Sequence, residues 1–232
     1  MIMKTILLFI AIISVNCFSK PNIPLINSFN NKFKQIARDW FIKRAETHGI
    51  EWTKYKKYYE DNMEELQRLF DSINNNTIVY PDYYTKQFHA YDEGNLNWLA
   101  SLENEASTLS MSSNYFEKLD PFESSKLIRL TFLDFINEYN VENNNMKIKN
   151  VLDVGCSTGI STEYIYRYFS RIKLTAIDLS PYFLAIARFN SFKKIIPITF
   201  IHNNAESMNI ESDSMDLVTC SYMFHELPPL AT

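Results

Sequence analysis

Two acidic residues flank a turn of small residues, and this spacing suits the binding of a nucleotide-like ligand. Asp153 lies within an apolar run, the turn from Gly155 to Gly159 follows it, and Asp178 ends the next apolar run. Glycine lets backbone approach a ligand closely, and an acid at the end of a second strand can accept hydrogen bonds from ribose hydroxyls. The residues therefore predict a ligand site that begins at this turn.

The segments that must position these groups alternate between strand-like and helix-like patterns. Expected strands cover residues 151–154, 174–177, 198–202 and 217–221, and expected helices cover 160–170 and 181–192. Pro181 suits the first turn of the second helix. Nearly continuous apolar strands that alternate with helices predict a parallel sheet buried on both faces, and hence an α/β fold.

The part of the chain before this pattern is predicted to be mainly helical. Expected helices cover residues 28–48, 52–73 and 95–111, and a last helix starts at Pro121. Through residues 52–73 the apolar residues recur every three or four positions, which indicates one helix with an apolar stripe. Asp120 before Pro121 has the residue type of a helix cap.

The amino terminus is typical of a targeting segment. Lys4 precedes an apolar run from Ile6 to Val15, and the small residues Cys17 and Ser19 follow, with a candidate cleavage position after Ser19. The run matches a signal peptide and is shorter than the about 20 residues that span a bilayer. We therefore expect entry into the secretory pathway and no stable transmembrane span, with an uncleaved anchor as the alternative. The basic segment after Ser19 also allows a two-part leader, secretory first and organelle second.

These patterns divide the chain into three parts. Residues 1–19 form the signal peptide or the first part of a leader, residues 20–145 a mainly helical region, and residues 146–232 a partial α/β domain.

Composition narrows the class of protein. The 232 residues are 46% hydrophobic and 15% aromatic, which is ample for a packed core. A net charge of −4 gives no electrostatic reason to expect a nucleic-acid partner. The three cysteines, Cys17, Cys156 and Cys220, form no CxxC pair, so we expect neither a disulfide framework nor a metal site.

Three chemistries use a glycine turn of this kind. Dinucleotide binding requires G-x-G-x-x-G, which fails at its second and third glycines because Ser157 and Ile160 stand there. A serine hydrolase requires G-x-S-x-G, which the turn around Ser157 satisfies, and Asp216 and His225 follow in the required order. Against a hydrolase, the upstream region is helical and no glycine-rich oxyanion loop precedes the turn.

The third chemistry explains more residues. The run Asp153-Val154-Gly155-Cys156-Ser157-Thr158-Gly159 resembles the acid-x-Gly-x-Gly-x-Gly turn of class I S-adenosylmethionine-dependent methyltransferases, with Ser157 at the middle glycine. Asp178 matches the family's acid after the second strand, and Asn204-Ala205-Glu206 resembles its Asp/Asn-Ala-Glu element. Residues 213–218 and 225–228 resemble the entry and exit of its fourth strand. The resemblance covers residues 150–228 and implies a Rossmann-like sheet.

The resemblance also implies a cofactor, S-adenosyl-L-methionine, and a role for individual residues. The cofactor-binding residues would be Asp153, Gly155, Cys156, Ser157, Gly159, Asp178, Leu179, Asn204 and Ala205. Asp153 would face the ammonium group, Asp178 the ribose hydroxyls, and Asn204 with Ala205 the adenine ring. His225, after the fourth strand, is the candidate catalytic base for an acidic methyl acceptor.

The resemblance leaves the methyl acceptor open. The family's sheet has further strands after the fourth, whereas this sequence stops at Thr232. We therefore expect either an active methyltransferase with a small-molecule or other unidentified acceptor, or a cofactor-binding but inactive module. An apolar fourth strand left at an open edge predicts poor solubility or dependence on a partner. The sequence indicates no oligomeric state.

A tyrosine-rich segment joins the second and third expected helices. It reads Tyr80-Pro81-Asp82-Tyr83-Tyr84 and, further on, Phe88-His89-Ala90-Tyr91-Asp92-Glu93-Gly94-Asn95. It resembles the front of uncharacterised methyltransferase-like proteins of plants and algae, which allows a plastid destination behind the leader. Such side chains can line a pocket, but without a clean periodicity we favour a strap packed over the α/β domain.

Overall fold

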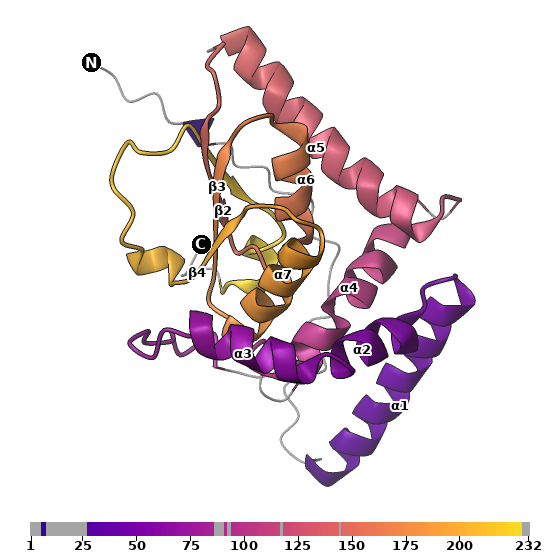
Figure 1. The fold of residues 1–232 in the computed structure, drawn as a ribbon. Helices are drawn as coiled ribbons and strands as arrows, with labels where there is room; N and C mark the ends of the chain where they lie inside the picture. The colour runs from indigo at the N-terminus through magenta and orange to yellow at the C-terminus, as the bar shows by residue number, and fades with distance from the viewer. Residues whose placement is uncertain are drawn as a thin grey trace.

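A parallel β-sheet with helices gathered on one face forms the centre of the molecule (Figure 1). The structure, a computed structural model, describes residues 6–7, 27–85, 91, 94–116, 118–143 and 145–228. The sheet order is β1-β5-β2-β3-β4. The strands are β1 (Ile6–Leu7), β2 (Asn150–Val154), β3 (Lys173–Asp178), β4 (Thr199–His202) and β5 (Leu217–Cys220). The predicted Rossmann-like α/β class is confirmed, as are the last four strands within a few residues.

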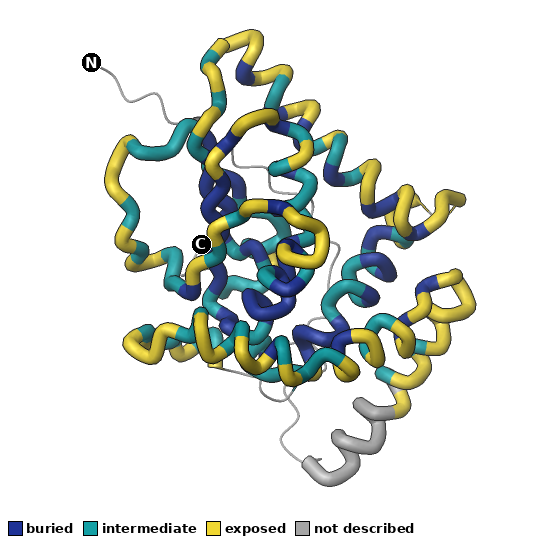
Figure 2. Tube along the Cα trace, in the orientation of Figure 1, coloured by how far each residue is buried: buried dark blue, intermediate teal, exposed yellow. Residues whose placement is uncertain are grey.

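Helices cover one face of this sheet, and a loop covers the other (Figure 2). Helix α6 (Ile160–Tyr168) joins β2 to β3, and α7 (Pro181–Lys193) joins β3 to β4. On the helical face, Val151, Leu174 and Leu217 pack against α6 and against α5 (Pro121–Asn143). On the opposite face, Leu152 and Ile177 pack against the connection from β4 to β5. Burial on both faces explains why the strands are nearly continuous apolar runs.

The strand register brings the predicted site residues to one end of the sheet. Val154 of β2 pairs with Ile177 of β3 and with Cys220 of β5. Asp178 of β3 pairs with His202 of β4. Because all these strands are parallel, the loops that follow them meet at the carboxyl end of the sheet, where ligands bind in open α/β folds.

The region before the sheet is mainly helical, as predicted. Besides α5, its helices are α1 (Asn27–Thr47), α2 (Trp52–Glu60), α3 (Met63–Ile73) and α4 (Trp98–Ser113). The last helix is capped as expected, because an oxygen of the Asp120 carboxylate accepts hydrogen bonds from the backbone N–H groups of Phe122 and Glu123. Helix α4 begins later than predicted because the side chain of Asn97 caps it.

The prediction of one helix over residues 52–73 is wrong, because the apolar stripe is carried by two helices. The break falls at Asp61 and Asn62, where Asn62 leaves the helical conformation with φ −113° and ψ 18°. The Asn62 amide donates to the carbonyl oxygen of Tyr58 at 2.7 Å. Short polar side chains compete for backbone groups in this way, so the chain can turn while the apolar spacing continues.

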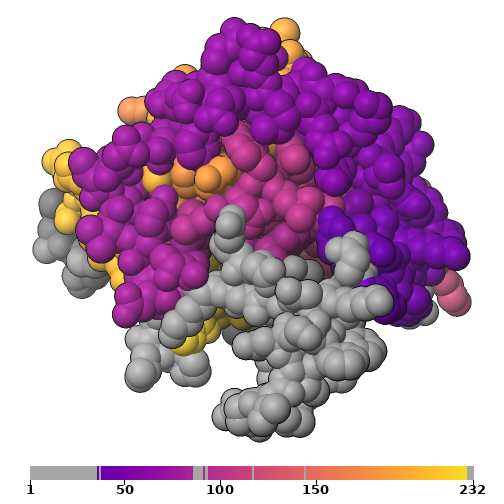
Figure 3. Space-filling view, turned by 90° about the horizontal axis from the view of Figure 1, so that it is seen from below, coloured from indigo at the N-terminus to yellow at the C-terminus, as the bar shows by residue number. Residues whose placement is uncertain are grey.

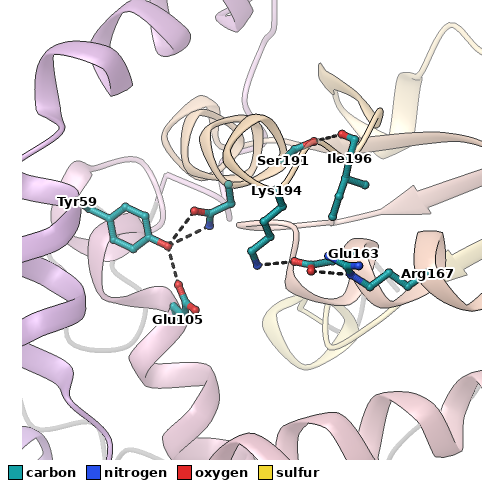
Figure 4. A network of polar contacts seen from close by, with 8 residues as sticks. Tyr59, Glu105, Glu163, Arg167, Ser191, Lys194 and Ile196 are labelled. Carbon is teal, nitrogen blue, oxygen red and sulfur yellow. Dashed lines mark hydrogen bonds and ion pairs between the residues drawn. The ribbon is translucent and has the colours of Figure 1, made fainter.

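The helical region is fixed to α7 by a buried tyrosine (Figure 4). The hydroxyl of Tyr59 in α2 donates to Glu105 of α4 at 2.6 Å, and the amide of Asn190 in α7 donates to the Tyr59 oxygen at 3.0 Å. Burial and the charge of Glu105 raise the pKa of Tyr59, so it stays neutral as a donor. Lys194 and Arg167 both pair with Glu163 beside this contact. The two parts of the chain therefore form a continuous packed unit here.

Strand β1 covers part of the β5 edge of the sheet, which the sequence predicted to be open. Ile6 pairs with Leu217 and Leu7 with Val218, so the prediction of an unpaired fourth-strand edge is wrong at these residues. The rest of the predicted leader lies outside the described residues, and its targeting role stays a prediction. Within the part of the chain that the structure describes, no helix has both the length and the apolar character needed to cross a membrane.

Candidate ligand site at the carboxyl end of the sheet

Asp178 presents a buried carboxylate at the end of β3. Its two oxygens accept hydrogen bonds from the backbone N–H groups of Ser157 and Ser180, each at 2.8 Å. Burial raises the pKa of Asp178 to about 6, although the N–H groups oppose this rise. A carboxyl oxygen can accept more than one hydrogen bond, so this group can still receive hydroxyl donors from a ligand.

Asp153 lies deeper, in the middle of the sheet. It is 1% exposed, and its oxygens accept hydrogen bonds from Thr162 of α6 at 2.6 Å and Thr219 of β5 at 2.8 Å. Burial raises its pKa to about 6, because desolvation outweighs the two hydroxyl donors. The structure therefore gives Asp153 a positioning role between α6 and β5, and a contact with a ligand ammonium group stays a prediction.

The turn between them has the backbone shape that glycine favours. Gly155 and Gly159 have φ of +67° and +80°, and Ser157 between them has φ of 51°. A Cβ on Gly155 would come within 2.8 Å of the Met223 sulfur. Backbone N–H groups of Gly155 and Cys156 donate to the carbonyl of Ile177, which anchors the turn to β3. The side-chain oxygen of Ser157 is buried and has no hydrogen-bond partner among the described residues.

Gly159→Ala is expected to lower the free energy of unfolding by about 1–3 kcal/mol, because it adds both backbone strain and overpacking. A Cβ at Gly159 would lie 3.2 Å from the Cβ of Ala187, a contact fixed by the backbone of α7. Gly49→Ala is the matched control, since Gly49 has φ of +84° but nothing within 4 Å of its added Cβ. Urea denaturation measures both variants, and equal losses would contradict this packing role for Gly159.

The loops after β3 and β4 form the side of the site where the resemblance expects an adenine ring. Asn204 caps the short helix η1 (Ala205–Ser207), because its side-chain oxygen accepts a hydrogen bond from the Glu206 backbone at 2.9 Å. His202 is 2% exposed, and its Nε2 lies 3.0 Å from the carbonyl oxygen of Leu179. Burial lowers the pKa of His202. His202 thus links the two loops, a role that no motif in the sequence indicated.

The tyrosine-rich segment crosses this end of the sheet. We call residues 80–95 the strap; residues 86–90, 92 and 93 lie outside the described residues. The Tyr80 hydroxyl lies 3.2 Å from Nε2 of His202, and the Tyr83 hydroxyl donates to Glu206. The Asn95 amide donates to Glu226 at 2.9 Å. The interpretation as a strap packed over the α/β domain agrees with these contacts, but nothing in the sequence indicated that Asn95 and Glu226 bond each other.

Two titratable groups follow β5, in the short helix η2 (Phe224–Glu226). The side chain of His225, the predicted base, is 44% exposed, and its Nε2 lies 3.9 Å from an oxygen of Glu226. Partial burial lowers the pKa of His225. Burial and the charge of Asp178 raise the pKa of Glu226 to about 7. Glu226 is therefore the group of this pair with an electrostatic link to Asp178.

The structure thus brings most of the predicted residues to one place. Asp178, Leu179, Asn204 and the turn 155–159 surround the carboxyl ends of β2, β3 and β4, and His225 lies beyond β5. Among the described residues, no group of three or more His, Cys, Asp or Glu side chains is arranged to hold a metal ion. The arrangement can bind a ligand that carries hydroxyl donors and a positive charge.

Comparisons with known proteins agree with this chemistry. Residues 151–231 match the family model described as "Methyltransferase domain". The chain is similar to "Ubiquinone biosynthesis O-methyltransferase" of Xanthomonas campestris pv. campestris (strain B100), with 36% identity over 83 residues, 35% of this chain and 34% of that protein. It is also 36% identical over 81 residues to the protein of that name from Proteus mirabilis (strain HI4320), covering 34% of this chain and 32% of that protein.

A solved structure matches over a similar span. It is the crystal structure of a S-adenosylmethionine-dependent methyltransferase from Clostridium acetobutylicum ATCC 824, with 32% identity and a TM-score of 0.34. The match covers 38% of this chain and 34% of that chain. This chain spans about a third of the length of the curated relatives it matches.

Proposed function

We propose that this chain, whose residues 151–231 match the methyltransferase-domain model, is a class I S-adenosylmethionine-dependent methyltransferase that binds S-adenosylmethionine and transfers its methyl group to an acceptor. The observation that carries the proposal is the position of Asp178, a buried carboxylate at the end of β3 beside a turn with positive φ at Gly155 and Gly159. In α/β nucleotide sites, a carboxylate placed in this way accepts hydrogen bonds from ribose hydroxyls.

The residues present fit this cofactor. The turn is held in a shape that an ordinary side chain would strain, and the buried Ser157 oxygen has no hydrogen-bond partner among the described residues. Asp178 would hold the ribose, and Leu179 with the loop at Asn204 and Ala205 would enclose the adenine. Asp153 and Asp178 bring negative charge close to the turn, which favours a ligand with ammonium and sulfonium groups.

Bound S-adenosylmethionine would supply an electrophilic methyl group on a sulfonium, and the residues of this chain would mainly position it for in-line displacement. An acceptor with an ionisable O–H or N–H group must also lose its proton. His225 and Glu226 both lie after β5, at the end of the sheet where the acceptor would approach, and each can take that proton. The names of the relatives point to an oxygen acceptor, and we propose a hydroxyl-bearing small molecule.

The alternative to an active methyltransferase is a module that binds the cofactor but transfers no methyl group. Incubation of the full chain with S-adenosylmethionine labelled in the methyl group and a panel of phenols and alcohols tests transfer directly. Label in an acceptor supports the enzyme, whereas cofactor binding without transfer to any acceptor of the panel supports the module.

Ser157→Ala is expected to leave cofactor binding within about threefold of the wild type, since one neutral hydrogen bond contributes about 1 kcal/mol or less. The same change would abolish a serine hydrolase. The geometry gives the hydrolase no support, because the Ser157 oxygen has no hydrogen bond to a described histidine. Calorimetric titration with S-adenosylmethionine and an esterase assay, each on both proteins, separate the two activities. Serine-dependent ester hydrolysis by the wild type would contradict the proposal.

We also propose that the amino-terminal segment directs the chain into the secretory pathway, with a plastid as the final destination if the leader has two parts. The support is the sequence pattern from Lys4 to Ser19. Expression with a carboxy-terminal fluorescent fusion in algal cells would report the compartment.

A further inference from the structure

Three loops of the α/β domain and the strap meet at Asp178. The Tyr80 hydroxyl and the Leu179 carbonyl both lie next to Nε2 of His202, and Tyr83 donates to Glu206 just after Ala205. The strap therefore contacts each loop that the proposed function assigns to the adenosine. In Figure 3, residues of the α/β domain, in orange, are seen between segments of the helical region, in purple and magenta.

Asn95 is the residue that joins the strap to both sides of the site. Its backbone carbonyl accepts a hydrogen bond from the Ser180 hydroxyl at 2.7 Å, and the backbone N–H of Ser180 donates to Asp178. Its side-chain amide donates to Glu226 at 2.9 Å. A continuous chain of hydrogen bonds therefore runs from Asp178 through Ser180 and Asn95 to Glu226.

Tyr84 is the strap residue that packs against Tyr80. Its ring stacks on that of Tyr80, with ring centroids 6.1 Å apart and planes at 7°. Burial, and then the charges of Asp178 and Glu226, raise the pKa of Tyr84 well above its usual value. The phenol is therefore a neutral group with an apolar face and a hydroxyl, and it stacks on Tyr80, whose hydroxyl lies 3.2 Å from Nε2 of His202.

The strap lies beside Asp178 without taking its acceptor positions. Among the described residues, the hydrogen bonds to the Asp178 carboxylate come from the backbone N–H groups of Ser157 and Ser180. The hydrogen bonds of Asn95 go to Ser180 and to Glu226, and Tyr84 stacks on Tyr80. This arrangement is that of a wall next to a binding group, rather than a plug inserted on it.

We propose that Tyr84 and Asn95 form a wall of the nucleoside half of the cofactor site, so that adenosine is held between the helical region and the sheet. The proposal rests on the proposed function and adds two binding residues from a part of the chain outside the family match. It also assigns the tyrosine-rich segment a ligand: the adenosine group of S-adenosylmethionine and of its product S-adenosylhomocysteine.

The test is calorimetric titration of the full chain with S-adenosylhomocysteine, for the wild type, Asn95→Ala and Tyr84→Ala. Each variant is expected to bind about tenfold more weakly or worse, since Asn95→Ala loses the hydrogen bond to Glu226 and Tyr84→Ala loses the ring that stacks on Tyr80. The matched controls are Asn143→Ala and Tyr168→Phe, two partners of surface hydrogen bonds, which should stay within about twofold.

If both strap variants bind S-adenosylhomocysteine with unchanged affinity, the proposal that the strap lines the site is wrong. Tighter binding would also contradict the proposal, because it would mean that the strap blocks the site. Failure of the wild type itself to bind would instead overturn the proposed function. If a variant does not fold, hydrogen exchange on the wild type decides. Added S-adenosylhomocysteine should slow hydrogen exchange in residues 80–85 together with residues 155–159. If exchange slows only in residues after 150, the strap does not contact the ligand and the proposal is wrong.

Discussion

Asp178→Ala is expected to weaken the binding of S-adenosylmethionine by at least about 100-fold, the largest loss among the single changes considered. Two ribose hydroxyls that donate to one ionised carboxylate contribute about 1.5–3 kcal/mol each. The carboxylate also holds the N–H groups of Ser157 and Ser180, so its loss loosens the turn that meets the rest of the cofactor. Isothermal titration calorimetry on the full chain measures the effect.

A control must separate lost binding from lost folding. Asp178→Asn keeps one acceptor for the backbone N–H groups, and thermal unfolding of each variant reports whether the fold survives. Asp134→Ala is the matched control, because it removes an exposed carboxylate that accepts a hydrogen bond from Tyr168 and, among the described residues, has no hydrogen bond to the turn 155–159. This variant should bind S-adenosylmethionine as tightly as the wild type does. A folded Asp178→Ala protein with wild-type affinity would remove the observation on which the proposed function depends.

Asp153→Asn is expected to raise the free energy of unfolding at pH 7.5 by about 1–3 kcal/mol and to give no gain near pH 4. The pKa of Asp153 rises from 3.8 to about 6 on folding because the carboxylate is desolvated. Between these values the folded state keeps a proton that the unfolded state loses. Stability from this group therefore falls as pH rises from about 4 to about 6 and stays low above that.

Urea denaturation of the wild type and Asp153→Asn from pH 4 to pH 8 measures how the free energy of unfolding of each changes with pH. Asp134→Asn is the surface control, and its free energy of unfolding should change with pH as that of the wild type does. The amide can still bond the hydroxyls of Thr162 and Thr219, which now receive a neutral partner. A variant that is less stable than the wild type at pH 7.5 would contradict this account. Retention of a destabilising acid is expected where its charge serves a ligand.

The elements that follow residue 150 could be predicted because their signals are local. The apolar runs, the glycine turn and Pro181 each act on neighbouring residues, so β2, α6, β3 and α7 begin and end close to their expected positions. The same holds for the cap at Asp120. Parallel register then follows from topology, and it brings Asp178 next to the turn without any further information.

The remaining features depend on contacts between distant parts of the chain. Periodicity through residues 52–73 gave no sign of the turn at Asn62, because the apolar stripe continues across it. The bonds from Asn95 to Ser180 and Glu226 join residues far apart in sequence, and no short motif encodes such a meeting. The pairing of β1 with β5 is likewise long-range. The turn and Asp178 could therefore be predicted from a local motif, whereas the contacts of the strap could be found only in the folded chain.

The most direct test of the central claim is a calorimetric titration of the wild-type full chain with S-adenosylmethionine at pH 7.5. We expect saturable binding of one cofactor per chain, competed by S-adenosylhomocysteine. A folded protein that shows no saturable binding at millimolar cofactor would contradict the claim.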